Sequence, residues 1–225
     1  MSNSTHESDP SNRDRTDWNV DYDIDPIRLR DPAAEALAVL ESGDPIVITY
    51  ADVVKAAGHS CPTAAGAYRI AKTGLEALYP GDELPVRGDI DVLAGGPRDD
   101  PAYGVTARLI SYVTGAAGED GFAGLAGGHG GRKNLLHYGA IGTDGIAFEF
   151  TRTDTDETVR VIYHVADVPS GGPAVDDLPK LIEGTATDAE REAFAEDWHG
   201  RVDAVLNGDR YVTVERSPNP NSADQ

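Results

Sequence analysis

The chain has 225 residues, and 40% of them are apolar, so it is long enough to bury a sizeable core in one large domain. Its 39 acidic and 19 basic residues give a net charge of −20, and the acid excess runs through the whole chain. Such a surface repels nucleic acid and anionic membranes, so we expect neither as a partner; adaptation to a salt-rich, halophilic cytoplasm explains the acidity.

The single cysteine and the distribution of apolar residues exclude two further classes of protein. One cysteine cannot build an internal disulfide framework. The N-terminal stretch MSNSTHESDPSNRDRTDW has none of the apolar character of a signal peptide, and no segment approaches the roughly 20 apolar residues that span a bilayer. The sequence therefore predicts a cytoplasmic protein.

Helices and strands are predicted in mixed order between two polar ends of the chain. Residues 1–25 are acidic and predict a disordered arm, and residues 217–225 predict a disordered tail. Capping signals and apolar periodicity predict helices at 31–43, 51–58, 61–78, 105–118 and 185–206. β-Branched content and alternation predict strands at 45–50, 88–95, 135–139, 145–152 and 157–165, the last two forming a hairpin.

This order of elements predicts an α+β fold, with helices packed on a mainly antiparallel sheet in a single domain. We expect residues 26–165 to form the core and residues 166–216 to form a helical C-terminal extension. Thr187 and Glu190 make a capping box at the start of the last helix. We expect that helix to pack on the core or on a dimer interface through its apolar residues, Phe194, Trp198, Val202 and Val205.

The stretch AGHSCPTAAGAYR (57–69) places His59 and Cys61 at the start of the predicted helix 61–78. The N–H groups at a helix N-terminus favour a nearby anion, and so they favour the thiolate form of a cysteine. Thiolate and imidazole together suit a transition metal, zinc first, and also iron, copper or nickel. The alternative is a small buried cysteine that fills space beside a capping histidine.

Two ligands are too few for a closed metal site, which normally has four. Two further candidates are His129, in the glycine-rich loop 121–134, and His137, in the predicted strand 135–139, although each also fits an ordinary surface or strand position. Arg132 and Lys133 make the same loop the one locally basic spot of the chain, which predicts a bound anionic group. The loop lacks the phosphate-loop pattern.

Three motifs follow one another along the chain: GHSCPTAAGAYRIAKTGLEAL (58–78), then VTG with a glycine-rich stretch and GRKNLLHYG (113–139), and then IAFEFTRTDTDETVRVIY (146–163). In this order they resemble the motifs of the FmdE family, which takes its name from a component of formylmethanofuran dehydrogenase. The resemblance covers residues 45–165. It implies an α+β core, usually a homodimer, with a cleft that contains His59 and Cys61 and a metal, often zinc.

Three positions depart from the pattern of that family. Val105 and Arg108 stand near the places where the family usually has a cysteine and an aspartate, and His137 stands where it has the aspartate of Asp-Tyr-Gly. The resemblance therefore implies a site that has lost a thiolate and a carboxylate and has gained an imidazole. A metal there would be held by His59 and Cys61 with His137 or His129 and water.

Three functions stay open at this point. The first is a metal-binding FmdE-like protein; if it is a redox-associated metalloenzyme, His59 and Cys61 are the catalytic pair, and Arg132 and Lys133 orient an anionic substrate. The second is a non-enzymatic accessory protein that delivers a metal or metal cofactor to a molybdenum- or tungsten-type redox enzyme, the association that the family name records. The third is a metal-free protein with a reactive thiol at Cys61.

Overall fold

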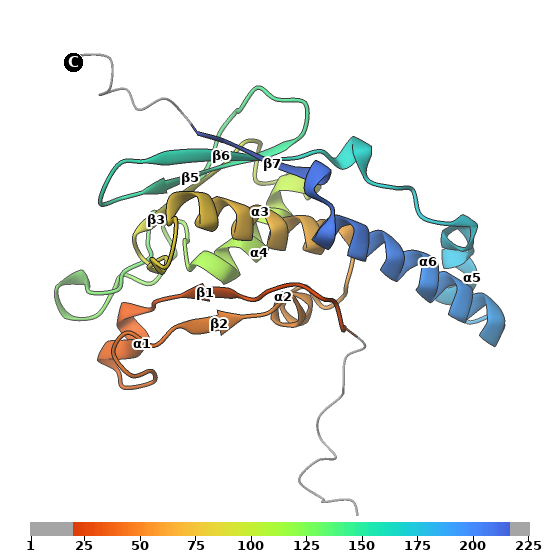
Figure 1. Ribbon diagram of the computed structural model, residues 1–225, viewed down its shortest axis with the longest axis horizontal. Coiled ribbons are helices and arrows are strands. Elements are labelled where there is room, and N and C mark those ends of the chain that lie inside the picture. The colour runs from red at the N-terminus through yellow and green to blue at the C-terminus, as the bar shows by residue number, and fades with distance from the viewer. Residues whose placement is uncertain (1–19, 217–225) are drawn as a thin grey trace, which may run out of the picture.

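The computed structural model describes residues 20–216, which form an α+β fold (Figure 1). The six α-helices of this part are α1 (Pro32–Ala36), α2 (Tyr50–Ala57), α3 (Pro62–Leu78), α4 (Pro101–Thr114), α5 (Leu178–Glu183) and α6 (Asp188–Asn207). The strands are β1 (Ile27–Leu29), β2 (Ile46–Ile48), β3 (Ile90–Ala94), β4 (Leu136–Tyr138), β5 (Ile146–Arg152), β6 (Thr158–Tyr163) and β7 (Val212–Arg216). None of the helices in this part is long and apolar enough to cross a membrane.

The strands form two sheets that lie on opposite sides of α3 and α4 (Figure 1). The main sheet has the order β4-β3-β5-β6-β7, and all of its neighbouring strands are antiparallel except β3 and β4. The second sheet is the antiparallel ribbon of β1 and β2. The prediction of an α+β fold with a mainly antiparallel sheet is therefore confirmed.

Helix α3 is the centre of the core, and its sequence explains why it begins and packs where it does. Pro62 occupies the first turn, where no backbone N–H is needed, and Cys61 is the N-cap. Ten residues of the helix are buried, among them the glycines at 66 and 74. A Cβ on Gly66 would overlap the ring of Tyr163, and one on Gly74 would lie 2.6 Å from the ring of Phe150. These glycines therefore let α3 lie close against β5 and β6.

Most predicted elements are confirmed, and three elements were not predicted. The helix predicted at 105–118 begins earlier, because Asp100 caps it and Pro101 occupies its first turn. The helix predicted at 31–43 is short and ends at Ala36. Strand β1, helix α5 and strand β7 are additional. Strand β7 lies within the segment predicted as a helical extension and pairs with β6, so this segment also completes the main sheet.

The last helix, α6, joins the C-terminal part to the core. The capping box of Thr187 and Glu190 is confirmed. Val202 and Val205 are fully buried, Trp198 packs partly against the core, and the ring of Phe194 stacks on Trp198 with centroids 5.6 Å apart. The expected packing of this helix on the core is therefore present, through its C-terminal half.

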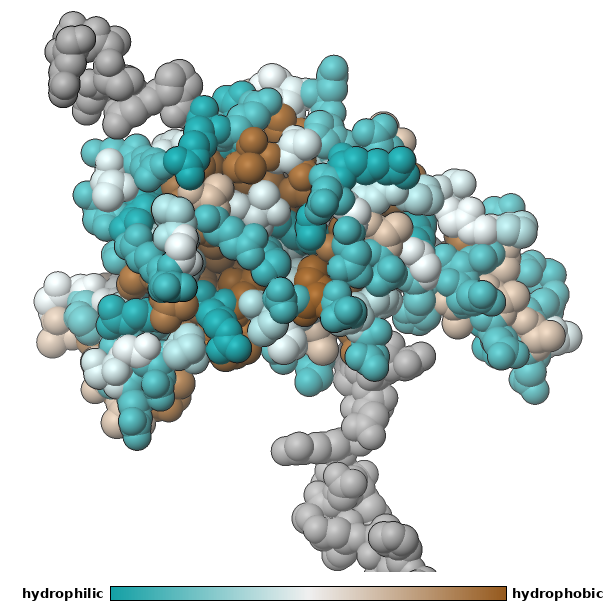
Figure 2. Space-filling model, viewed as in Figure 1, coloured by the Kyte–Doolittle hydropathy of each residue, from teal (hydrophilic) through white to brown (hydrophobic). Residues whose placement is uncertain are grey.

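Part of the predicted N-terminal arm also packs on the core. Residues 1–19 and the predicted tail 217–225 lie outside the described residues. Of the residues that follow, Val20, Tyr22 and Ile24 pack against the core cluster. The hydroxyl of Tyr22 contacts Nδ1 of His199 on α6, so the chain reaches the core before β1 begins. Figure 2 shows that hydrophilic side chains cover most of the face in view, with apolar side chains between them near its centre.

Candidate functional site

Cys61 lies where three elements meet at the start of α3. Its sulfur accepts a hydrogen bond from the backbone N–H of Ala64 at 3.4 Å, and the residue is partly exposed. On one side of it, the carbonyl of Ser60 accepts a hydrogen bond from the indole of Trp198 on α6, 2.8 Å away. On the other side, the hydroxyl of Tyr163 on β6 donates to the carbonyl of Pro62 at 3.1 Å. The backbone on either side of Cys61 is therefore tied to α6 and to β6.

Two tyrosines keep their protons beside this segment. Burial raises the pKa of Tyr163 to about 12, with a smaller opposing effect of the Arg201 charge. Burial also raises the pKa of Tyr50, whose hydroxyl lies 3.0 Å from the Ser60 hydroxyl. Both phenols thus stay neutral at physiological pH and serve as hydrogen-bonding groups for residues 60 and 62.

His59 is exposed and contacts only its own local backbone among the described residues. It follows Gly58, whose φ of +79° ends helix α2 in the left-handed region. Its Nδ1 lies 3.2 Å from the carbonyl oxygen of Ala57. His59 is therefore exposed and Cys61 partly exposed, and both lie at the start of α3.

The other two predicted metal ligands are held elsewhere by their own partners. Nε2 of His129 lies 3.2 Å from the carbonyl oxygen of Pro32. Nε2 of His137 on β4 lies 2.9 Å from a carboxylate oxygen of Asp91 on β3. Over residues 20–216, no three His, Cys, Asp or Glu side chains are grouped so that they could hold a metal ion. One protomer thus does not assemble a closed metal site from His59, Cys61, His129 and His137, and metal binding stays a prediction.

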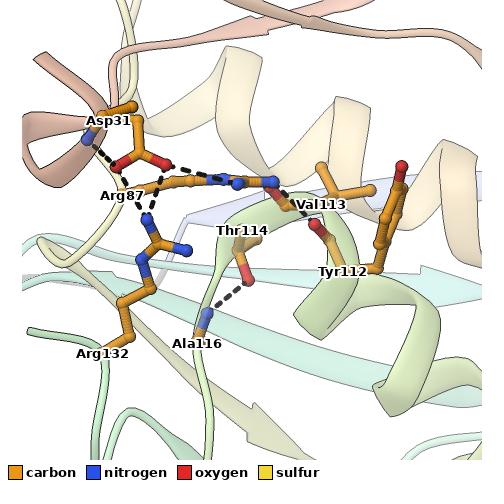
Figure 3. A network of polar contacts seen from close by, with 8 residues as sticks. Asp31, Arg87, Tyr112, Val113, Thr114, Ala116 and Arg132 are labelled. Atoms are coloured by element: carbon orange, nitrogen blue, oxygen red, sulfur yellow. Dashed lines mark hydrogen bonds and ion pairs between the residues drawn. The ribbon is translucent and has the colours of Figure 1, made fainter. Parts of the chain in front are cut away.

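A buried network of charges joins residues that are far apart in the sequence (Figure 3). The carboxylate of Asp31, the N-cap of α1, accepts from the backbone N–H of Ala34 at 3.2 Å. Nη2 of Arg132 donates to both of its oxygens, at 2.7 and 2.6 Å, and Nη1 of Arg87 lies 3.4 Å from one of them. The side chains of Asp31 and Arg87 are 5% and 10% exposed, so this is a buried ion pair cluster.

Arg87 also fixes the C-terminal end of α4. Its guanidinium donates to the carbonyl of Val113 at 3.0 and 2.8 Å and to that of Tyr112 at 2.7 Å. These carbonyls belong to the last turn of the helix, where a cation is favoured by the helix dipole. Next to them, the Thr114 hydroxyl accepts a hydrogen bond from the N–H of Ala116 (Figure 3). The VTG motif and the GRKN motif therefore meet at one place.

In this network the pKa of Asp31 and the pKa of Arg87 are both lowered from their ordinary values. Burial alone would raise the pKa of Asp31, but the Ala34 N–H and the charges of Arg132 and Arg87 outweigh it and lower that pKa. Burial and the nearby Arg132 charge lower the pKa of Arg87, and Asp31 opposes them. The carboxylate is thus held ionised between two cations.

A hollow of about 560 Å³ opens beside this network. Its lining combines cationic, hydroxyl and apolar groups: Ile46, Val47, Ile48, Asp52, Arg87, Ser111, Tyr112, Gly115, Phe122 and Arg132. Val47, Tyr112 and Phe122 are 42–45% exposed, so apolar side chains stand beside the polar groups in the wall of the hollow. Nε of Arg132 is buried and has no hydrogen-bond partner among the described residues. The hollow therefore brings two arginines together with exposed aromatic side chains.

A neighbouring groove of about 690 Å³ shares Ser111 with this hollow and continues along α4. Val105 and Arg108, the two positions that depart from the FmdE pattern, line this groove. With valine and arginine there, the groove receives neither a thiolate nor a carboxylate from these positions.

Sequence reasoning found part of this arrangement and missed the rest. It identified Arg132 as a candidate for anion binding, and Arg132 lines the hollow. Lys133, its predicted companion, is exposed and is not among the lining residues. Arg87 and Asp31 were missed as site residues; the only local signal was the helix-start pattern at Asp31 and Pro32, which says nothing about a partner 101 residues away.

Comparison with known proteins agrees with the motifs that the sequence contains. No curated protein matches the chain. The family profile described as "FmdE, Molybdenum formylmethanofuran dehydrogenase operon" matches residues 56–213. This match covers more than half of the chain and includes α3, α4, the strands β3 to β6 and α6. The chain therefore belongs to the FmdE family.

Proposed function

We propose that this FmdE-family protein binds a small anionic ligand in the hollow beside Arg87 and Arg132. The observation that carries the proposal is that Arg87 and Arg132 both line the hollow, whereas Asp31, the carboxylate between them, is not among its lining residues. The Arg132 guanidinium is a planar fork that suits a carboxylate or phosphate group.

The carboxylates near the hollow already have other partners. Both oxygens of Asp31 are already engaged by Arg132 and Arg87. The carboxylate of Asp52 accepts from the backbone N–H and the hydroxyl of Thr49, as part of the capping box of α2. The exposed rings of Tyr112 and Phe122 favour a ligand that also has an apolar part. An aromatic or aliphatic carboxylate combines these two properties.

Arg132→Lys is expected to weaken the binding of benzoate about tenfold, because lysine keeps the charge but loses Nε and the planar fork. The test is isothermal titration calorimetry with benzoate and, separately, with inorganic phosphate. It is performed at the lowest salt concentration at which circular dichroism shows a folded protein, since salt screens exposed charges. Benzoate is expected to bind more tightly than phosphate, because only benzoate has an apolar part.

Lys133→Ala is the matched control for this experiment. It removes the neighbouring positive charge, but Lys133 does not line the hollow. Benzoate binding is expected to stay within about twofold of the wild type, since an exposed charge contributes little. If Arg132→Lys and Lys133→Ala lowered the affinity for benzoate equally, only the overall positive charge of the loop would attract anions. That result, or no binding to the wild type, would refute the proposal.

A metal at the start of α3 is a second candidate, favoured by the exposed His59 two residues from the partly exposed Cys61. Thiolate and imidazole suit zinc, and two donors leave at least two positions for other ligands. We propose that these come from outside the protomer, either from the second copy in a homodimer or from a metal cofactor that the protein delivers to a redox enzyme. In the second case the protein is an accessory protein and not an enzyme.

Elemental analysis combined with light scattering tests this second candidate. We expect metal in the dimer fraction of the wild type and at least a fivefold lower metal content in both His59→Ala and Cys61→Ala. His164→Ala is the control, because its ring lies beside Thr213 on β7 and has no proposed role in the site. Metal-free wild type in every fraction, after expression in metal-replete medium, would exclude the metal and leave Cys61 as a metal-free thiol.

A further inference from the structure

Residues 20–26, VDYDIDP, lie on the core without belonging to a helix or a strand. Apolar residues alternate with exposed aspartates in this segment, and the apolar ones pack against the core cluster: Val20, Tyr22 and Ile24. Among the described residues, the one backbone–backbone hydrogen bond of the segment is internal, from the N–H of Ile24 to the carbonyl of Tyr22 at 2.9 Å. Side chains therefore hold this segment, which we call the strap, on the core.

Tyr22 is the anchor of the strap. Its ring meets the ring of Tyr50 edge-on, with centroids 5.4 Å apart, and its hydroxyl contacts Nδ1 of His199. The same hydroxyl lies 3.5 Å from the hydroxyl of Ser60, the residue before Cys61. The strap therefore lies against the segment that leads to the thiol.

The exposed side of the strap carries three negative charges: Asp21, Asp23 and Asp25. None of them forms an ion pair within residues 20–216. Burial raises the pKa of Tyr22, the hydrogen bond with Ser60 opposes this rise, and the negative charge of Asp203 on α6 adds to it. The strap is thus held beside further negative charge, in a chain with a net charge of −20. Electrostatic repulsion therefore opposes its docking, and salt screens that repulsion.

We propose that the strap is a salt-dependent cover of the corner formed by Ser60 and Cys61. At high ionic strength the aspartates are screened and the strap stays docked through its apolar residues. At low ionic strength repulsion releases the strap, and the thiol of Cys61 becomes more reactive. A segment that is held by few contacts opens locally at a small cost in free energy, while the rest of the protein stays folded.

This device is independent of the other proposals. It concerns access to the thiol and requires neither an anion beside the arginines nor a metal at the start of α3. The strap also lies outside residues 56–213, the part of the chain that the family profile matches.

The reaction rate of Cys61 with an uncharged thiol reagent tests the proposal. Cys61 is the only cysteine of the chain, so the reagent reports on this corner alone. The full chain reacts with dithiodipyridine at constant pH, with a chelator present to keep the thiol free of metal. The thiolate attacks the disulfide of the reagent and releases thiopyridone, whose absorbance is followed. The rate constant of the wild type is expected to fall about fivefold as the KCl concentration rises to about 2 M, because screening docks the strap. The range begins at the lowest concentration at which circular dichroism shows a folded protein.

Two variants of the strap separate its anchor from its charges. Tyr22→Ala removes the ring that contacts Tyr50 and is expected to raise the rate constant at high salt about tenfold and to abolish the salt dependence. Asp21→Asn combined with Asp23→Asn keeps the apolar anchors, so the reaction is expected to be slow and to vary less than about twofold over the same range.

Glu41→Gln combined with Asp44→Asn is the matched control, because it removes two exposed charges from the loop between α1 and β2. It is expected to keep the salt dependence of the wild type. If it weakened this dependence as much as the strap aspartates do, repulsion across the whole chain would control the thiol and the proposal would be wrong. A salt-independent wild type, or a Tyr22→Ala variant as slow as the wild type, would also overturn it. The aspartate variant keeps every apolar contact of the strap, so it decides the matter even if Tyr22→Ala does not fold.

Discussion

Asp31→Asn is expected to lower the free energy of unfolding by about 3 kcal/mol at neutral pH, the lower end of the range for breaking a buried ion pair. Asparagine keeps an oxygen that can cap α1, so the change isolates the loss of charge. Arg87 and Arg132 would then face each other without a counter-charge. Chemical denaturation measures the effect, and a fall in the melting temperature of roughly 6–12 °C should accompany it.

The stability difference between the wild type and Asp31→Asn is expected to depend on pH. The pKa of Asp31 is lowered in the folded protein. A lowered folded-state pKa gives stability that is present above the unfolded value of about 3.9 and is lost as the pH falls through the folded value. The difference between the wild type and Asp31→Asn should therefore be constant near neutral pH and shrink below about pH 4. A difference that is independent of pH would contradict a charge effect.

Glu76→Gln is the control for the charge effect. Glu76 also forms an ion pair, with Lys72 one helical turn away, but its side chain is 63% exposed. Its loss is expected to change the free energy of unfolding by only about 0.5 kcal/mol. If the two variants had equal effects, burial of Asp31 would not be the reason for its importance.

Gly66→Ala is expected to destabilise the protein by about 2 kcal/mol, although alanine is the better helix former by about 1 kcal/mol. The added methyl group would overlap the ring of Tyr163, which is 3% exposed and hydrogen-bonded to Pro62. Helix α3 or strand β6 must then move, and core positions tolerate such overpacking poorly. Denaturant unfolding at constant salt measures the difference.

Gly200→Ala is the matched control, because it makes the same change inside another helix. A Cβ on Gly200 of α6 would meet nothing within 4 Å, and the residue is exposed. Only helix propensity acts there, so this variant is expected to be more stable than the wild type by about 0.5–1 kcal/mol. The two substitutions should therefore have opposite signs. Stabilisation by Gly66→Ala would disprove the close approach of α3 to β6.

Local signals in the sequence account for most of the elements. The proline and small residues of 61–78 predict α3, the Thr-Asp-Thr-Asp turn predicts the hairpin of β5 and β6, and Thr187 with Glu190 predicts the start of α6. Each of these signals lies within a few residues of the structure it produces, so no tertiary contact is needed to interpret it. The family motifs are of the same kind, and the family was identified from them.

The sequence contains no local signal for the strands β1 and β7. Strand β7 has one buried residue followed by four exposed ones, so it shows no alternation and becomes a strand only by pairing with β6. Strand β1 has three residues, which is too few for a periodic pattern. Tertiary pairing overrides the weak local preference in both cases.

The same distinction between local signals and tertiary packing applies to the candidate site. The order of residues along the chain is enough to put His59 and Cys61 together at a helix start and Arg132 in a basic loop. The packing of the elements was needed to pair Arg132 with Asp31, 101 residues away, and to bring Arg87 to the end of α4. Neighbours along the chain are set by covalent spacing, whereas partners across the core depend on how the helices and sheets pack.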